Sequence, residues 1–75
     1  MKQFKHLDSK TVELAGIAAS IACGCRPCLE YHFKKALELG CTQGQVKESV
    51  ELGKVIKERP VKDIYEHAEK LINNL

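Results

Sequence analysis

Features typical of membrane, nucleic-acid and nucleotide-binding proteins are missing from this sequence of 75 residues. No stretch approaches the ~18 consecutive apolar residues of a membrane span, and the N-terminus contains no apolar signal-peptide core. Its 12 basic and 10 acidic side chains are interspersed, whereas a nucleic-acid footprint needs clustered Lys and Arg. A glycine-rich phosphate-binding loop is also lacking. We therefore expect a cytoplasmic protein that binds neither nucleic acid nor membrane and needs no cofactor.

No internal repeat, low-complexity tract or linker divides the chain, so residues 1–75 are predicted to form a single domain. A domain of this size buries only about 60% of the surface that its unfolded chain exposes. Disulfides, a metal ion or association with other chains usually add the missing stability. Because thiols are kept reduced in the cytoplasm, the four cysteines do not by themselves indicate a structural disulfide framework.

The hydrophobic pattern predicts an all-α fold of about four helices and no strands. Asp8 or Ser9 is expected to cap a first helix that runs to about Ala22. The second helix is expected over residues 26–39, because Gly24 breaks the first helix and Gly40 can end the second.

Two further helices are predicted in the second half of the chain. Thr42 and Gln45 have the spacing of a capping box, which opens the third helix. The "KERP" segment is expected to end that helix, and Pro60 to start the fourth. The fourth helix carries an apolar seam at alternating three- and four-residue spacing, which predicts packing against another helix. The seam consists of Val61, Ile64, Ala68, Leu71 and Leu75.

The first helix is apolar around almost its whole circumference. Only a narrow stripe of Glu13, Gly16 and Ser20, with Gly24 beyond it, interrupts the apolar surface. A helix of this kind must be buried on nearly all sides, and three short neighbours can hardly cover it. We therefore expect a homo-oligomer; the alternative is a compact monomer with alanine-rich packing.

The segment "CGCRPCLEYH" contains a CxxC motif, Cys25 to Cys28, at the start of the second helix. Unpaired N–H groups at a helix N-terminus favour a thiolate there, and Arg26 adds a positive charge. Cysteines three residues apart on a helical turn can close a small, reversible disulfide. His32 follows Cys28 by one helical turn, where an imidazole can take and return a thiol proton near neutral pH.

Glu13 is an unusual carboxylate at the edge of the most apolar helix. If the chain reverses near Gly24 and the two helices pack antiparallel, Glu13 and His32 differ in height by about 4.5 Å. A long side chain or one bridging water can span that difference. The expected order is Glu13, His32, Cys28, in which the carboxylate orients the imidazole and the imidazole serves the thiol. The alternative is that Glu13 is a capping or surface residue in the first turns of the helix.

Two other interpretations of the cysteine cluster remain open. Cys23, Cys25, Cys28 and His32 supply four ligands of the kind that tetrahedral zinc prefers, although the gap from Cys23 to Cys25 is unusually tight. Buried, inert cysteines are the second alternative, and Cys41 is expected to pack rather than react.

Taken together, Glu13, eleven intervening residues, Cys25, Cys28 and His32 resemble the motif of one known family. Residues 7–48 are similar to the alkylhydroperoxidase D (AhpD)-like branch of the carboxymuconolactone decarboxylase family. The Leu-Asp-x-Lys-Thr entry and the Gly-Cys-Thr start of the third helix are also similar.

The resemblance implies an all-α domain that assembles as trimers or hexamers, with sites near subunit contacts. It also implies catalytic roles for Cys25, Cys28, His32 and Glu13 in thiol peroxidase or disulfide-reductase chemistry. Cys28 would attack the hydroperoxide and become a sulfenic acid. Cys25 would donate a proton and resolve that acid, and Glu13 and His32 would form the proton relay. An external thiol or dithiol would then reduce the pair.

The sequence departs from the family pattern at two positions. Some peroxidase members have a histidine where this chain has Pro27, and Cys23 is an additional thiol with no role in the pattern. The decarboxylase members act on a lactone without needing the cysteine pair. The presence of Cys25 and Cys28 therefore argues against that reaction here.

Overall fold

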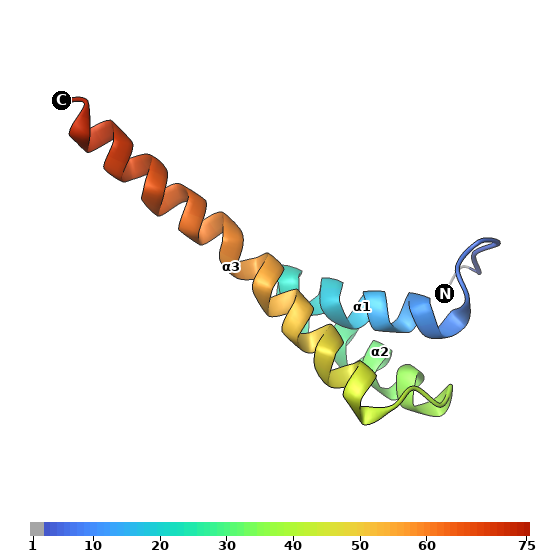
Figure 1. Cartoon of the computed structure of the whole chain (residues 1–75). Helices are drawn as coiled ribbons and strands as arrows, with labels where there is room; N and C mark the ends of the chain where they lie inside the picture. The colour runs from blue at the N-terminus through green and yellow to red at the C-terminus, as the bar shows by residue number, and fades with distance from the viewer. Residues whose placement is uncertain (1–2) are drawn as a thin grey trace.

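The computed structural model describes residues 3–75, which fold into three helices and no strands (Figure 1). Helix α1 spans Ser9–Cys23, α2 spans Arg26–Glu38 and α3 spans Gln43–Asn73. A tight turn reverses the chain between α1 and α2, while α3 crosses α1 and then projects beyond it (Figure 1). The predicted all-α class is confirmed, with three helices in place of about four.

The ends of the helices are set by local interactions that the sequence predicts. Asp8 caps α1 through its side chain, and a backbone N–H three residues on lowers the pKa of that carboxyl. Gly24 and Gly40 adopt left-handed backbone angles, with φ of 74° and 88°, where α1 and α2 have ended. The Thr42–Gln45 capping box is present at the start of α3.

The predicted break at Pro60 is wrong, because α3 runs through Pro60 as one continuous helix of 31 residues (Figure 1). A proline inside a helix removes one backbone hydrogen bond and crowds one carbonyl, at a cost of about 3 kcal/mol. The residues on both sides of Pro60 are mostly good helix formers such as Lys, Glu and Ala. Once a helix is nucleated, they can extend it across one lost bond.

The core is small and lies where the three helices meet. Its buried members are Ile17, Ala36, Cys41 and Val46, with Leu14, Leu29 and Val50 packed against them. Cys41 is 6% exposed, which agrees with a packing role. No helix of the described residues is long and apolar enough to cross a membrane.

Helices α2 and α3 cover only part of the surface of α1. Glu13 and Ser20, from the polar stripe, are buried, whereas Ala15 and Ala19 on another side of the helix are exposed. The stripe therefore faces inward toward the other helices, because its small and polar members allow close contacts there. Part of the apolar circumference remains open in the single chain.

Helices α1 and α3 approach closely at Gly53, which is buried. A Cβ atom placed on Gly53 would lie 2.6 Å from the carbonyl oxygen of Ala18 and 2.7 Å from Cβ of Ile21. Both contacts involve atoms that cannot swing away. The glycine is therefore needed for the distance between these two helices.

We expect Gly53→Ala to lower the free energy of unfolding by about 1–3 kcal/mol, because the added methyl group forces the helices apart. Urea denaturation at fixed protein concentration measures the change. Gly44→Ala is the matched control, since its Cβ would meet only Thr42 Oγ1 at 3.7 Å. That variant should be neutral or more stable. Equal losses in the two variants would contradict the packing argument.

Candidate active site

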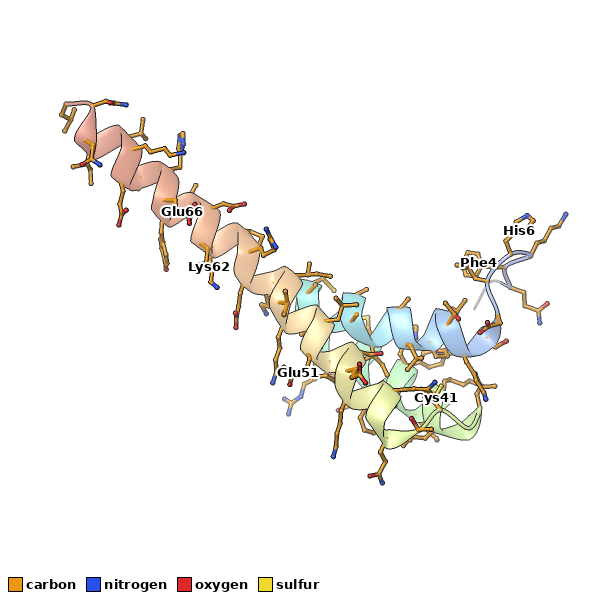
Figure 2. The ribbon with its side chains drawn as sticks, viewed as in Figure 1. Phe4, His6, Cys41, Glu51, Lys62 and Glu66 are labelled. Atoms are coloured by element: carbon orange, nitrogen blue, oxygen red, sulfur yellow. A yellow bond between two sulfur atoms is a disulfide. The ribbon has the colours of Figure 1, made fainter. Side chains whose placement is uncertain are left out.

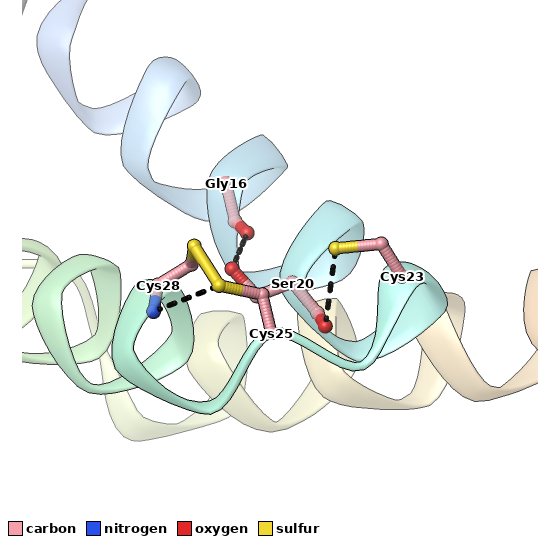
Figure 3. The surroundings of a disulfide bond; sticks show 5 residues. All are labelled: Gly16, Ser20, Cys23, Cys25 and Cys28. Carbon is pink, nitrogen blue, oxygen red and sulfur yellow. Dashed lines mark hydrogen bonds between the residues drawn. A yellow bond between two sulfur atoms is a disulfide. The ribbon is translucent and has the colours of Figure 1, made fainter.

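A disulfide joins Cys25 and Cys28 at the start of α2, with an S–S distance of 2.05 Å and a Cα–Cα distance of 5.3 Å (Figure 3). The first helical turn brings the two residues to the same side of α2. The pair lies beside the C-terminal end of α1, where the backbone N–H of Cys25 donates to the carbonyl of Ser20 at 3.0 Å. The sulfurs are thus held between the end of one helix and the beginning of the next.

Cys25 is itself the N-cap residue of α2. Its Sγ accepts a hydrogen bond from the backbone N–H of Cys28 at 3.3 Å (Figure 3). Pro27 occupies the first turn, where the N–H that it lacks would have no helical partner. The same N–H group and the helix dipole stabilise a negative charge on the Cys25 sulfur when the disulfide is open.

One turn farther along α2, His32 contacts Glu13 of α1. The distance from His32 Nδ1 to Glu13 Oε2 is 2.7 Å, and the two side chains are 16% and 9% exposed. Because an ionised carboxylate only accepts hydrogen bonds, Nδ1 carries the proton in this contact. In the neutral ring, Nε2 is then the unprotonated nitrogen that can accept a proton. The antiparallel packing expected from the sequence brings these two residues together.

Gly16 makes room for this contact. A Cβ atom on Gly16 would lie 2.5–2.8 Å from three atoms of the His32 ring, so the imidazole rests directly on the backbone of α1. The sequence shows Gly16 only as part of the polar stripe. Its spacing of three residues after Glu13, on the same face, is the signal that could have identified it.

Two further side chains near the site differ in their contacts. Cys23 is exposed and free, and its Sγ donates to the carbonyl of Ser20 at 3.8 Å (Figure 3). Tyr31 packs edge-on against His32, with ring centroids 5.1 Å apart. Within residues 3–75, no hydrogen bond joins the His32 ring to Cys25 or Cys28.

The four residues of the zinc alternative do not converge in this structure. Cys25 and Cys28 are bonded to each other, Cys23 faces Ser20, and His32 is engaged by Glu13. Nowhere in the described part of the chain do three or more His, Cys, Asp or Glu side chains group in a way that could hold a metal ion.

Comparison with known families identifies residues 2–57 as a match to the carboxymuconolactone decarboxylase family. The chain belongs to this family. The carboxymuconolactone decarboxylase family contains enzymes, among them the AhpD peroxidases, and the match includes Glu13, both cysteines of the pair and His32. Comparison with curated proteins and with solved structures yields no significant match. The family match ends within α3, so residues 58–75 extend beyond it.

We expect Gly16→Ala to displace the His32 ring and to lower the free energy of unfolding by about 1–3 kcal/mol. In a His32→Ala background the same change should be neutral or stabilising, because the obstructing ring is gone and alanine favours a helix. A double-mutant cycle by urea denaturation measures the difference. An equal effect of Gly16→Ala in both backgrounds would show that the ring does not rest on this glycine.

Proposed function

We propose that this protein is a thiol oxidoreductase that cycles Cys25 and Cys28 between disulfide and dithiol. Its oxidising substrate is a hydroperoxide or another disulfide. The observation that supports this most strongly is the disulfide at the N-terminus of α2, one turn before a histidine held by a buried carboxylate. Membership of the carboxymuconolactone decarboxylase family also supports it.

In the peroxide reaction, the Cys28 thiolate attacks one oxygen of the O–O bond. The bond breaks, an alcohol leaves after taking up a proton, and Cys28 becomes a sulfenic acid. The Cys25 thiol then condenses with that acid, forming the disulfide and releasing water. Two electrons from an external thiol or dithiol restore the starting state. Such a reductant is maintained in the cytoplasm, where we propose that the protein acts.

Glu13 and His32 act as the proton relay in this proposal. The 2.7 Å contact directs Nδ1 toward the carboxylate, and Nε2 is left to exchange a proton with the cysteine pair. Burial of Glu13 protects the contact from competition by water. The backbone N–H of Cys28 and the helix dipole stabilise negative charge on the Cys25 sulfur as it attacks the sulfenic acid.

We expect mild hydroperoxide to remove two free thiols per chain from the reduced protein, and dithiothreitol to restore them. Thiol titration measures both steps. Cys25→Ser and Cys28→Ser should each abolish the loss of two thiols, because a disulfide needs both sulfurs. His32→Ala and Glu13→Gln should slow disulfide formation, with about 100-fold for His32→Ala as the typical contribution of a proton-transfer group.

Two controls accompany this titration. Cys41→Ser should still lose two thiols, since Cys41 lies in the core. Zinc content is measured on protein purified without added metal, because stoichiometric zinc with no thiol loss would favour a metal-binding module instead. Unchanged rates in His32→Ala would remove the relay from the proposal.

We also propose that the protein acts as a homo-oligomer, as the sequence predicts. The argument is that α3 continues past the end of α1, where the other helices do not cover it (Figure 2), and carries exposed apolar side chains there. At ~100° per residue, Ile64, Leu71 and Leu75 lie within about 40° of Gly53, the residue that contacts α1. Ile64 and Leu71 are 61% and 59% exposed. The side of α3 that packs on α1 therefore stays apolar in the part of α3 that lies beyond the end of α1.

A second copy of this chain is the partner that suits this face. Each copy offers large apolar side chains on α3 and an open face of small residues on α1, including Ala15 and Ala19. An open apolar hollow of about 490 Å³, lined by Phe33, Leu37 and Val50 among others, adds further uncovered surface. Large side chains from one copy can cover small residues of the other, which buries both.

We expect light scattering to give a mass that is a multiple of 8.4 kDa. Leu71→Glu should reduce that mass, because a charge cannot be buried in an apolar interface without a partner. Lys62→Gln is the matched control on the polar side of the same helix and should leave the mass unchanged. A wild-type mass of one chain would refute the oligomer.

A further inference from the structure

A shallow hollow of about 240 Å³ opens beside the Cys25 end of the disulfide. Its apolar lining includes Ile21 and Leu29, and the buried Ser20 also lines it. Its charged lining consists of Arg26, from the first turn of α2, and Lys57, from α3. Among residues 3–75, no carboxylate lines it. The hollow therefore combines apolar side chains, two cationic side chains and Cys25 of the disulfide.

Two segments of the chain that are distant in sequence bring positive charge to this place. Lys57 reaches from α3 toward the turn between α1 and α2, where its Nζ lies 3.7 Å from the position of a Cβ on Gly24. Arg26 follows Cys25 directly, and the positive end of the α2 dipole lies at the same turn. Disulfide exchange begins when a thiolate approaches a sulfur, so this positive potential acts on the reacting species itself.

We propose that this hollow binds an anionic thiol, one that carries a carboxylate or similar group beside its sulfur, as the reductant of the Cys25–Cys28 disulfide. The inference rests on the proposed function and adds the chemical class of the reductant and the sulfur that it attacks. The anionic group lies between Arg26 and Lys57, its carbon chain rests on Ile21 and Leu29, and its sulfur meets Cys25.

The step transfers two electrons. The incoming thiolate forms a bond to Cys25 Sγ while the Cys25–Cys28 bond breaks, and its electron pair leaves on Cys28 Sγ, which takes a proton. A second thiolate attacks the outer sulfur of the mixed disulfide and releases Cys25 as a thiolate. The reductant leaves as a disulfide, and both cysteines are reduced.

The test measures reduction of the oxidised protein by 3-mercaptopropionate, 2-mercaptoethanol and cysteamine, which are anionic, neutral and cationic beside the thiol. Each rate is divided by the thiolate concentration and corrected for the basicity of the thiol. The remaining difference between the three reagents is the charge of the group beside the sulfur. The expected order is anionic, then neutral, then cationic. Lys57→Gln and Arg26→Gln should each reduce the anionic-to-cationic ratio by about three- to fivefold, as exposed charges do.

Lys62→Gln is the matched control, because it removes one positive charge from α3 outside the hollow and should leave the ratio unchanged. High salt should reduce the ratio in the wild type. A ratio near one in the wild type, or an equal fall in Lys62→Gln, would overturn the inference. Failure of every thiol to reduce the pair would instead contradict the proposed function.

The attacked sulfur is tested separately by trapping with variants that lack one cysteine of the pair. In Cys28→Ser, oxidised 3-mercaptopropionate should form a mixed disulfide at Cys25 that mass spectrometry detects. Its rate of formation should fall with Lys57→Gln and not with Lys62→Gln. Faster trapping at Cys28 in Cys25→Ser, or a rate insensitive to Lys57, would show that the hollow does not guide the thiol to Cys25.

Discussion

The close approach of α1 and α2 at Gly16 is the constraint on which the site depends. Because Gly16 has no side chain, the His32 ring rests on the α1 backbone and reaches the Glu13 carboxylate at 2.7 Å. The contact has consequences beyond the two residues. It sets the proton on Nδ1, leaves Nε2 available and gives the buried Glu13 a hydrogen-bond partner, without which its burial would be costly. A larger residue at position 16 would disturb the position of the Nδ1 proton, the availability of Nε2 and the hydrogen bond of Glu13.

The disulfide depends on the same helix pair at its other end. Gly24 reverses the chain in a left-handed conformation, and Cys25 then caps α2 with sulfur in place of the usual oxygen. The disulfide and the helix cap therefore use the same atom. That sulfur accepts the N–H of Cys28 in the disulfide form, and a thiol or thiolate sulfur is an acceptor too. This arrangement suits the proposed cycle between disulfide and dithiol.

The third helix serves the site indirectly and extends well beyond it. Gly53 lets α3 pack tightly on α1, and Lys57 then reaches the turn next to Cys25. Beyond Lys57, α3 projects away from the other two helices (Figure 1). The molecule therefore measures 55 Å along its longest axis, for a chain of 75 residues. A small domain that leaves so much apolar surface open has little stability of its own. The proposed association and the disulfide both add stability that the small core does not supply.

The sequence by itself determined the helical class, the caps at Asp8 and Thr42, the turn at Gly24 and the CxxC–His spacing, because each depends on residues within a few positions of one another. It failed at Pro60, where the surrounding helix formers outweigh one lost hydrogen bond. Only the tertiary structure decided that the polar stripe of α1 faces inward, that Gly16 seats an imidazole and that Lys57 comes to the disulfide. These are contacts between helices, and they follow from crossing angles and close approach that no local pattern encodes.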